Sequence, residues 1–506
     1  MNSAFGFYRY STKKMMNKTT SIIGAVLIGF FVMINIVTLK DGHNWGGDFS
    51  QYIIHARNIV EGKPYSSDIM VALPVVCSPG FPLLLAPMVK VFGVNFVALK
   101  FLNVIFWYAG IFFLFLIFKK RVGQGLAMLL SGLLACSSFY FVFKQNVLSD
   151  LPFFCFVCLT MWLVDRYSRK DKKEIISEAG IVLAMSACVL IRYSGIILFV
   201  SSIFYFLFIQ KNKRLALGLF LGLLATLVVE LSWIGYQPGP VSLFAKHPDV
   251  YLKLAVHNLG VVFQSCVWFF LPGQMPVTSV LSNSLQTVMT WVSGVLFGGI
   301  VLLFIIKARK KELSFYGCFA FVYFVALVVW AAETTPPENF ARYLLPVVGY
   351  VPVFLFEQMS AWRKKDERVV KAVFVGLVFA FMVLNVFNIS AVYGFDDDAL
   401  FQKETQEMVA WVKNNTKPDD TLMFWRPRPL RLLTGRVCTA IWYPQYSNVH
   451  FLAQAQALKI SYLIFRKSEG AQFVAESENN PALVRPVWKN DEYKIFGLVD
   501  DGVNNN

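Results

Sequence analysis

A small set of ionisable side chains lies outside the basic clusters of an otherwise apolar chain, and these residues are the first candidates for chemistry. Charged groups at the ends of apolar segments are costly, so each of them needs a partner or a function. Carboxylates can accept protons and cations can neutralise phosphate, so a mixed set suits a site for a lipid headgroup. The residues are Asp48, Lys144, Asp150, Arg192, Glu230, Glu333, Glu338 and Arg342.

Apolar runs separate these residues and must position them. The chain has 506 residues, of which 56% are hydrophobic and only 15% are charged. Repeated apolar runs of about 20 residues indicate an all-α polytopic membrane protein, and we expect about eleven transmembrane helices. The runs are 21–39, 95–118, 124–143, 151–164, 175–191, 195–209, 215–234, 286–306, 313–332, 343–360 and 370–391.

The basic clusters between the runs predict the orientation. If each run crosses the membrane once, all clusters fall on one side, which the positive-inside rule makes cytoplasmic together with the N-terminus. The net charge of +16 is therefore topological, and we expect no nucleic-acid partner. The candidate residues then collect at the outer ends of their segments, whereas a transporter more often holds such groups near the bilayer midplane.

The domain organisation follows from the same pattern. We expect a transmembrane domain over 1–394, with outer loops 40–94 and 235–285, and a soluble extracytoplasmic α/β domain over 395–506. In the second loop, the apolar stretch 254–271 is expected to be re-entrant or interfacial. The C-terminal part contains a helical stretch to about residue 412 and strand-like runs at 421–425, 437–442 and 462–465. No Gly-rich phosphate loop precedes a helix, so no cytosolic nucleotide is expected.

The first outer loop contains an amphipathic helix that begins near Asp48. Its apolar positions recur at helical spacing, which predicts a helix in the membrane interface with its apolar stripe at the lipid boundary. A structural interpretation also exists, because Asp48 followed by Gln51 matches an N-cap with its partner. Asp150 likewise marks a helix start, and Arg192 and Arg342 are in positions from which they could reach the phosphates of bulk lipid.

Cysteine and histidine give little support for a redox or metal site. Cys155 and Cys158 have redox or zinc spacing, but they lie in an apolar run without polar partners and are expected to be packing residues. His43 and His55 flank the first-loop helix, and no two histidines have metal-ligand spacing.

Several motifs, taken in order, resemble those of a known family. These motifs are Gly47-Asp48, Tyr52, Ala56, Gly62, Tyr65, Ser78-Pro79-Gly80-Phe81-Pro82-Leu83, Phe92-Gly93, Ser149-Asp150-Leu151-Pro152-Phe153, Leu190-Ile191-Arg192-Tyr193-Ser194-Gly195 and Arg342-Tyr343-Leu344-Leu345-Pro346. They lie in the first outer loop and in the segments 149–153, 190–195 and 342–346. In this order they are similar to motifs of membrane-embedded glycosyltransferases with the C-type fold, close to protein O-mannosyltransferases and the aminoarabinose transferases of lipid A.

The resemblance implies transfer of a sugar from a polyprenyl-phosphate donor to an acceptor hydroxyl on the extracytoplasmic face of a bacterial inner membrane. The acceptor would be a glycan, a lipid or a protein. Asp48 would be the general base, and Asp150 would position the acceptor or the base. Arg342, assisted by Arg192 or Lys144, would neutralise the leaving phosphate. We further expect Tyr52, Tyr193, Tyr343 and Glu338 to contact the sugar or the acceptor.

Two departures from the family pattern qualify this prediction. Phe49 follows Asp48 where some members have a second acid, which argues against a divalent metal, and no cofactor is expected. Ser78 replaces the first proline of the usual Pro-Pro-Gly. Three alternatives remain: an O-antigen ligase or polymerase, a flippase or transporter of lipid-linked sugars, and a non-catalytic scaffold.

Overall fold

The computed structural model describes residues 24–65, 77–169, 174–234, 314–330, 341–351, 367–392, 399–440, 455–467 and 477–499, with a few single positions between them. The chain divides into two compact units. Unit 1 comprises Met1–Leu39, Lys100–Gln145 and Ser149–Phe395, and unit 2 comprises Lys40–Leu99, Asn146–Leu148 and Asp396–Asn506. The outer loop 40–94, which we assigned to the transmembrane domain, therefore lies in the same unit as the C-terminal residues.

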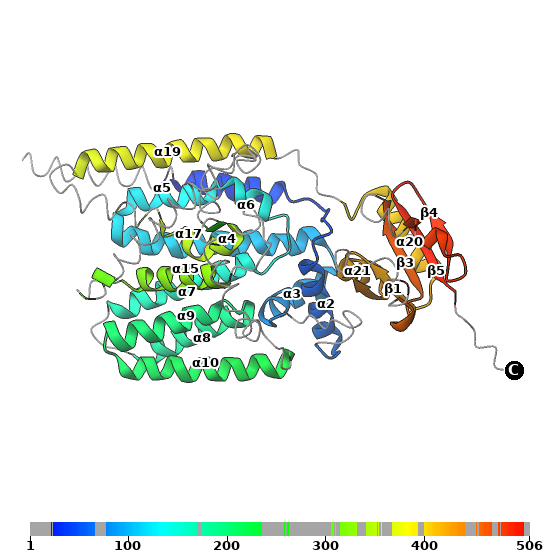
Figure 1. The fold of residues 1–506 in the computed structure, drawn as a ribbon. Helices are drawn as coiled ribbons and strands as arrows, with labels where there is room; N and C mark the ends of the chain where they lie inside the picture. The colour runs from blue at the N-terminus through cyan, green and yellow to red at the C-terminus, as the bar shows by residue number, and fades with distance from the viewer. Residues whose placement is uncertain are drawn as a thin grey trace, which may run out of the picture. The chain divides into compact units, whose positions relative to one another are not determined.

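Unit 1 is built from helices that lie side by side (Figure 1). Contacts link α7 to α8, α8 and α9 to α10, α9 to α15, and α5 to α19. The elements of this unit are Gly24–Val37, α4 (Phe96–Val122, which starts in unit 2), α5 (Gln124–Ala135), α6 (Ser138–Phe143), α7 (Asp150–Ser168), α8 (Ile175–Ile191), α9 (Gly195–Phe204), η1 (Tyr205–Ile209), α10 (Lys213–Ile234), α15 (Phe315–Trp330), η2 (Ala341–Leu344), α17 (Leu345–Val348) and α19 (Glu367–Val392).

Length and composition mark several of these helices as membrane-spanning. Among the described residues, four helices are long and apolar enough to cross a bilayer, and these are α4, α7, α10 and most of α19. The described helices also include shorter apolar ones such as Gly24–Val37 and α8. Large apolar side chains on α10 and α19 are exposed, for example Phe220 and Phe387, as expected for helices that face lipid. The mostly helical membrane fold is confirmed, whereas the number of eleven spans is not.

Two expected spans depart from a regular α-helix. The run 124–143 is divided into α5 and α6, because Ser137 leaves the helix and its side chain accepts a hydrogen bond from the backbone N–H of Tyr140. On α19, the Asn385 amide oxygen accepts hydrogen bonds from the backbone and the hydroxyl of Ser138, which satisfies polar groups freed by the break. The run 195–209 ends in the π-helical turn η1. The predicted re-entrant stretch 254–271 lies almost entirely outside the described residues.

In unit 2, the first outer loop forms α2 (Asp48–Glu61) and α3 (Gly80–Phe92), which pack on each other. The apolar side chains of α2, such as Phe49, Ile53 and Ala56, are buried within the protein. The expectation that this stripe lies at the lipid boundary was therefore wrong. An amphipathic pattern shows that a helix has an apolar face, but it does not distinguish protein from lipid as the partner of that face.

The C-terminal residues form a small mixed sheet covered by α20 (Lys403–Asn415) and α21 (Pro427–Thr434). The strand order is β2-β1-β3-β5-β4, in which β2, β1 and β3 are parallel and β3, β5 and β4 are antiparallel. A core that includes Met423, Leu463 and Phe496 holds the sheet together. The strands are β1 (Thr421–Phe424), β2 (Val437–Ala440), β3 (Tyr462–Arg466), β4 (Val484–Lys489) and β5 (Tyr493–Leu498), and only the first three were predicted.

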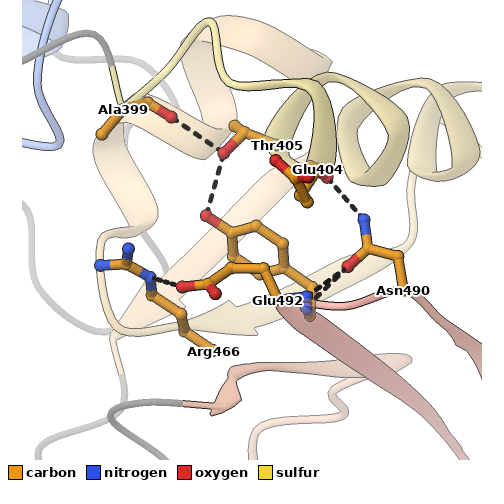
Figure 2. A network of polar contacts seen from close by, with 7 residues as sticks. Ala399, Glu404, Thr405, Arg466, Asn490 and Glu492 are labelled. Atoms are coloured by element: carbon orange, nitrogen blue, oxygen red, sulfur yellow. Dashed lines mark hydrogen bonds and ion pairs between the residues drawn. The ribbon is translucent and has the colours of Figure 1, made fainter.

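A polar network fastens α20 to the end of this sheet (Figure 2). The Thr405 hydroxyl lies 2.9 Å from the Ala399 carbonyl oxygen, to which it donates a hydrogen bond, and 3.0 Å from the hydroxyl of Tyr493. Asn490 donates a 2.9 Å hydrogen bond to the Glu404 carbonyl and accepts one of 2.7 Å from the backbone N–H of Tyr493. The C-terminal residues of unit 2 thus have both an apolar core and specific polar contacts.

Candidate active site

Asp48 lies in the first turn of α2. The residue that precedes the helix is Gly47, and no side chain caps the helix there. The interpretation of Asp48 as an N-cap was therefore wrong, because Asp48 is already inside the helix. A carboxylate at this end is stabilised by the helix dipole, and the side chain is 45% exposed. Asp48 thus combines a stabilised charge with access from outside.

The Asp48 carboxylate contacts an arginine from the C-terminal residues. Nη1 of Arg428 lies 3.2 Å from Oδ1 of Asp48 and donates a 2.7 Å hydrogen bond to Oε1 of Gln51. Residues three apart lie on one face of a helix, so a single guanidinium can reach both side chains. The Arg428 side chain is 24% exposed, which makes this a partly buried ion pair.

The backbone around this contact is adapted to it. A Cβ on Gly47 would lie 3.3 Å from the guanidinium carbon of Arg428, closer than most such contacts, so glycine allows the close approach. On the other side, Pro427 opens α21 and Gly435 ends it in the left-handed conformation, with φ of 75°. Pro427 and Pro429 flank Arg428 and fix φ on either side of it, which limits the freedom of its backbone.

Aromatic contacts link the segment before α2 to the end of β1. Trp45 is buried, and its ring centroid lies 5.1 Å from that of Phe424 and 6.4 Å from that of Trp425. At the start of α2, His43 stacks on Phe49 with centroids 3.7 Å apart. These aromatic contacts lie in the segments that lead into α2 and α21.

The far half of α2 is organised around His55. The ring of His55 stacks on Tyr65 with centroids 4.1 Å apart, and Nδ1 lies 2.7 Å from the Tyr65 carbonyl oxygen. Burial lowers the pKa of His55 to about 4, so the ring is neutral and Nδ1–H is the donor. Burial also raises the pKa of the Cys77 thiol to about 12, which argues against Cys77 as a thiolate nucleophile.

A second cluster lies in unit 1 and contains Asp150, at the start of α7, and Arg192, which follows α8. Nη1 of Arg192 lies 2.5 Å from Oδ1 of Asp150 and 3.4 Å from Oγ of Ser149. The side chains of Asp150 and Arg192 are 4% and 17% exposed. The prediction of Asp150 at a helix start is confirmed, and the acid is buried against a cation.

The dipeptides Arg192-Tyr193 and Arg342-Tyr343 contribute differently to this cluster. The guanidinium carbons of Arg192 and Arg342 lie 5.3 Å and 4.9 Å from the ring centroid of Tyr343. Arg342 also donates a 3.0 Å hydrogen bond to the Tyr343 hydroxyl, while the Tyr343 carbonyl accepts one from Tyr323. Tyr343 thus joins both arginines, whereas Tyr193 is exposed.

Lys144 follows α6 and is fully buried. Its ammonium group donates hydrogen bonds to the Asn35 carbonyl at 3.1 Å and to the Thr38 hydroxyl, and it lies over the ring of Phe141. Within the described residues, Lys144 therefore contacts the end of the helix Gly24–Val37 and α6. Its predicted role in phosphate binding stays a prediction.

Two further predicted contact residues have different outcomes. Tyr52 packs edge-on against Phe81 of α3, with centroids 4.9 Å apart. Glu338 lies outside the described residues.

Among the residues that the structure does describe, no group of three or more His, Cys, Asp or Glu side chains could hold a metal ion. Metal independence stays a prediction.

Arg428 and Gln51 are site residues that the sequence did not identify. Arg428 lies in the segment Arg-Pro-Arg-Pro, whose paired prolines indicate a helix start. That signal predicts α21, but nothing in the sequence connects it with Asp48, which is 380 positions away.

Comparisons with known proteins agree with the resemblance drawn from the sequence. Residues 76–234 match the model of the family described as dolichyl-phosphate-mannose-protein mannosyltransferase. An uncharacterized protein from Aquifex aeolicus is 21% identical over 395 residues, which cover 74% of this chain and 70% of the relative. The matched segment 76–234 contains Asp150 and Arg192.

Solved structures of two proteins share the fold. The archaeal oligosaccharyltransferase AglB from Archaeoglobus fulgidus, in complex with an inhibitory peptide and a dolichol-phosphate, is 12% identical with a TM-score of 0.58, over 92% of this chain and 71% of AglB. Apo ArnT from Cupriavidus metallidurans is 11% identical with a TM-score of 0.54, over 94% of this chain and 97% of ArnT. ArnT bound to undecaprenyl phosphate gives a TM-score of 0.51. The resemblance to C-type glycosyltransferases is confirmed, and the family match and the shared fold together indicate a glycosyltransferase.

Proposed function

We propose that this protein transfers a sugar from a polyprenyl-phosphate donor to an acceptor hydroxyl on the extracytoplasmic side of a bacterial inner membrane. The structural neighbours support a lipid-phosphate donor, since one contains a dolichol-phosphate and another contains undecaprenyl phosphate. The exposed, apolar faces of α10 and α19 agree with an enzyme that takes its donor from the bilayer.

The observation that carries the proposal is the cluster of Asp150, Arg192, Arg342 and Tyr343 in unit 1. These residues come from three separate helix junctions. Two guanidinium groups beside one tyrosine ring form a cationic site that suits a phosphate. The buried Asp150 carboxylate keeps one of these guanidinium groups in place.

The reaction needs a base on the acceptor and charge neutralisation on the donor. Asp48 would accept the proton of the acceptor hydroxyl as its oxygen attacks the anomeric carbon of the sugar. The bond from that carbon to the phosphate oxygen breaks, and its electron pair leaves with the polyprenyl phosphate. Arg342, assisted by Arg192, would stabilise the added negative charge, so no acid need protonate the leaving group. One displacement of this kind inverts the anomeric centre.

Transfer of labelled sugar by the purified protein tests the proposal. The donors are a panel of sugars linked to undecaprenyl phosphate, and the readouts are release of undecaprenyl phosphate and appearance of the label in a product. Asp48→Asn should lower the rate at least 100-fold, because general-base catalysis typically contributes about 10²–10⁴. Glu61→Gln, which removes a carboxylate from the other end of α2, is the matched control and should leave the rate unchanged.

Each alternative predicts a different result in the same assay. A flippase would move the intact lipid-linked sugar between leaflets without releasing undecaprenyl phosphate. An O-antigen ligase that takes its sugar from a diphosphate-linked donor would release no undecaprenyl phosphate from these monophosphate-linked donors and would not label a product. Equal transfer by the parent and by Asp48→Asn, with both variants folded, would remove Asp48 from the mechanism.

A further inference from the structure

Among the described residues, the side chain of Arg428 brings the C-terminal part of unit 2 into contact with the predicted general base. The sequence predicts a separate C-terminal domain, whereas these residues share one compact unit with the first outer loop. Arg428 donates a hydrogen bond to Gln51 and lies against the Asp48 carboxylate.

We infer that Arg428 is a positioning residue for Asp48, so that the C-terminal α/β part completes the catalytic site. The inference rests on the proposed function, in which Asp48 accepts the acceptor proton. Arg428 holds one carboxylate oxygen of Asp48 in a fixed direction through a permanent cation, because an arginine is not deprotonated in proteins. An ionised carboxylate has about four acceptor positions, so contact at Oδ1 leaves capacity for the substrate proton.

Three features of the described residues support this role. Gly47 removes the Cβ that would crowd the guanidinium, Pro427 and Pro429 restrict the backbone on both sides of Arg428, and Gln51 accepts the other hydrogen bond. The buried contact of Trp45 with Phe424 and Trp425 holds the segment that precedes α2 against the end of β1, from which the chain enters α21. Such support of a catalytic group by a second layer of contacts is what precise orientation requires.

The geometry also explains why Asp48 has no acidic neighbour in the sequence. Phe49 follows Asp48, its side chain is buried, and its ring lies 5.8 Å from that of Phe96. Within the described residues, the contact that orients Asp48 comes from the distant cation of Arg428. We therefore predict that the orientation of the Asp48 carboxylate depends on Arg428.

Kinetics of Arg428 variants test the inference. Arg428→Gln and Arg428→Ala should lower kcat for sugar transfer 10- to 100-fold with KM for the donor within twofold of the parent, whereas Arg428→Lys should retain an intermediate kcat. Guanidinium ion added to Arg428→Ala should restore part of the lost activity. Arg485→Gln, at an exposed arginine on β4 of the same sheet, is the matched control and should behave like the parent.

The double variant separates positioning from a structural effect. If both residues act as one unit, Asp48→Asn with Arg428→Gln should be no slower than Asp48→Asn alone. If the fold-losses in rate of the two single variants multiply in the double variant, the inference is overturned. A kcat of Arg428→Gln within twofold of the parent would also overturn it. A loss of folded protein in Arg428→Gln, read from its melting temperature and not restored by guanidinium, would show a structural role only.

Failure of the proposed function gives a different pattern. Undiminished transfer in Asp48→Asn would reject Asp48 as the base, whatever the Arg428 variants do. A strong loss in Asp48→Asn together with full activity in Arg428→Gln would keep the proposed function and reject the positioning role.

Discussion

Removal of the Arg192 charge should destabilise unit 1 more than removal of a comparable arginine at the other end of α7. Arg192 pairs with Asp150 at 2.5 Å, and Asp150 is 4% exposed. In Arg192→Gln the carboxylate would stay buried without its counterion. Breaking a buried ion pair by removing one partner typically costs about 3–5 kcal/mol. Arg192 is 17% exposed, so water can replace part of the contact, and we expect a loss of about 3 kcal/mol.

The same magnitude follows from the charges themselves. Two unit charges about 4 Å apart attract by about 4 kcal/mol at an effective dielectric constant of about 20. The desolvation cost of both groups reduces the net value of the pair, but it does not reduce the cost of leaving Asp150 alone. In the double variant Asp150→Asn with Arg192→Gln, that isolated charge is gone. The double variant should therefore lose less than the sum of the single losses, with a coupling of about 2 kcal/mol.

Unfolding of the detergent-solubilised protein measures this effect, with the midpoint of an SDS or guanidinium titration as the readout. Arg169→Gln is the comparison, because Arg169 pairs with Asp165 on α7 at 2.7 Å with its own side chain 43% exposed, although Asp165 is 9% exposed. Water reaches the Arg169 side of this pair more easily than Arg192, which is 17% exposed, so Arg169→Gln should lose less stability than Arg192→Gln. Equal midpoints for the Arg192 and Arg169 variants, or strictly additive losses in the double variant, would refute the reasoning.

Three other predictions concern pH, a buried lysine and metal ions. Burial lowers the pKa of His55 to about 4, so the unfolded chain binds more protons than the folded one between pH 6.5 and 4. The stability of α2 should therefore fall by about 3 kcal/mol in total as the pH falls through this window. Hydrogen exchange of α2 should become faster over the same window, and His55→Gln should make it independent of pH there. Lys144→Met should cost about 1–3 kcal/mol of stability, read by thermal melting in detergent, because the Thr38 hydroxyl and the Asn35 carbonyl lose their buried partner; an unchanged melting temperature would contradict this. Incubation with EDTA should leave sugar transfer unchanged, and recovery of activity only on adding a divalent cation would show that a metal takes part.

The unit 1 cluster could be anticipated from the sequence because topology constrains it. Alternate turns of an up-and-down helical bundle lie at the same end, so residues that precede α7, follow α8 and lie in η2 are brought to one end. Simple counting of spans and basic clusters therefore placed Asp150, Arg192 and Arg342 together. Their individual partners required the structure, since side-chain contacts such as that of Tyr343 with both arginines depend on packing.

Some features of unit 2 could not be predicted from the sequence, for physical reasons that differ between them. The strand β4 contains Pro486, which argues against a strand in a sequence pattern, but β4 is at the edge of the sheet and has an irregularity at Pro486/Trp488 that accommodates it. The partner of the apolar face of α2 was wrongly taken as lipid. Arg428 is distant in sequence and follows no periodic pattern that points to Asp48.

The environments of the two predicted acids support different roles for them. A general base must reach the acceptor, so it needs exposure and spare acceptor positions; Asp48 is 45% exposed at the start of α2. Asp150 is buried and binds Arg192 closely, which suits it to hold a cation and not to exchange protons with a substrate. If this division is right, Asp48→Asn lowers kcat with little change in donor KM. Asp150→Asn should instead raise the donor KM, because it releases Arg192 from its position beside Tyr343. The opposite assignment of effects would reverse the roles of the two acids.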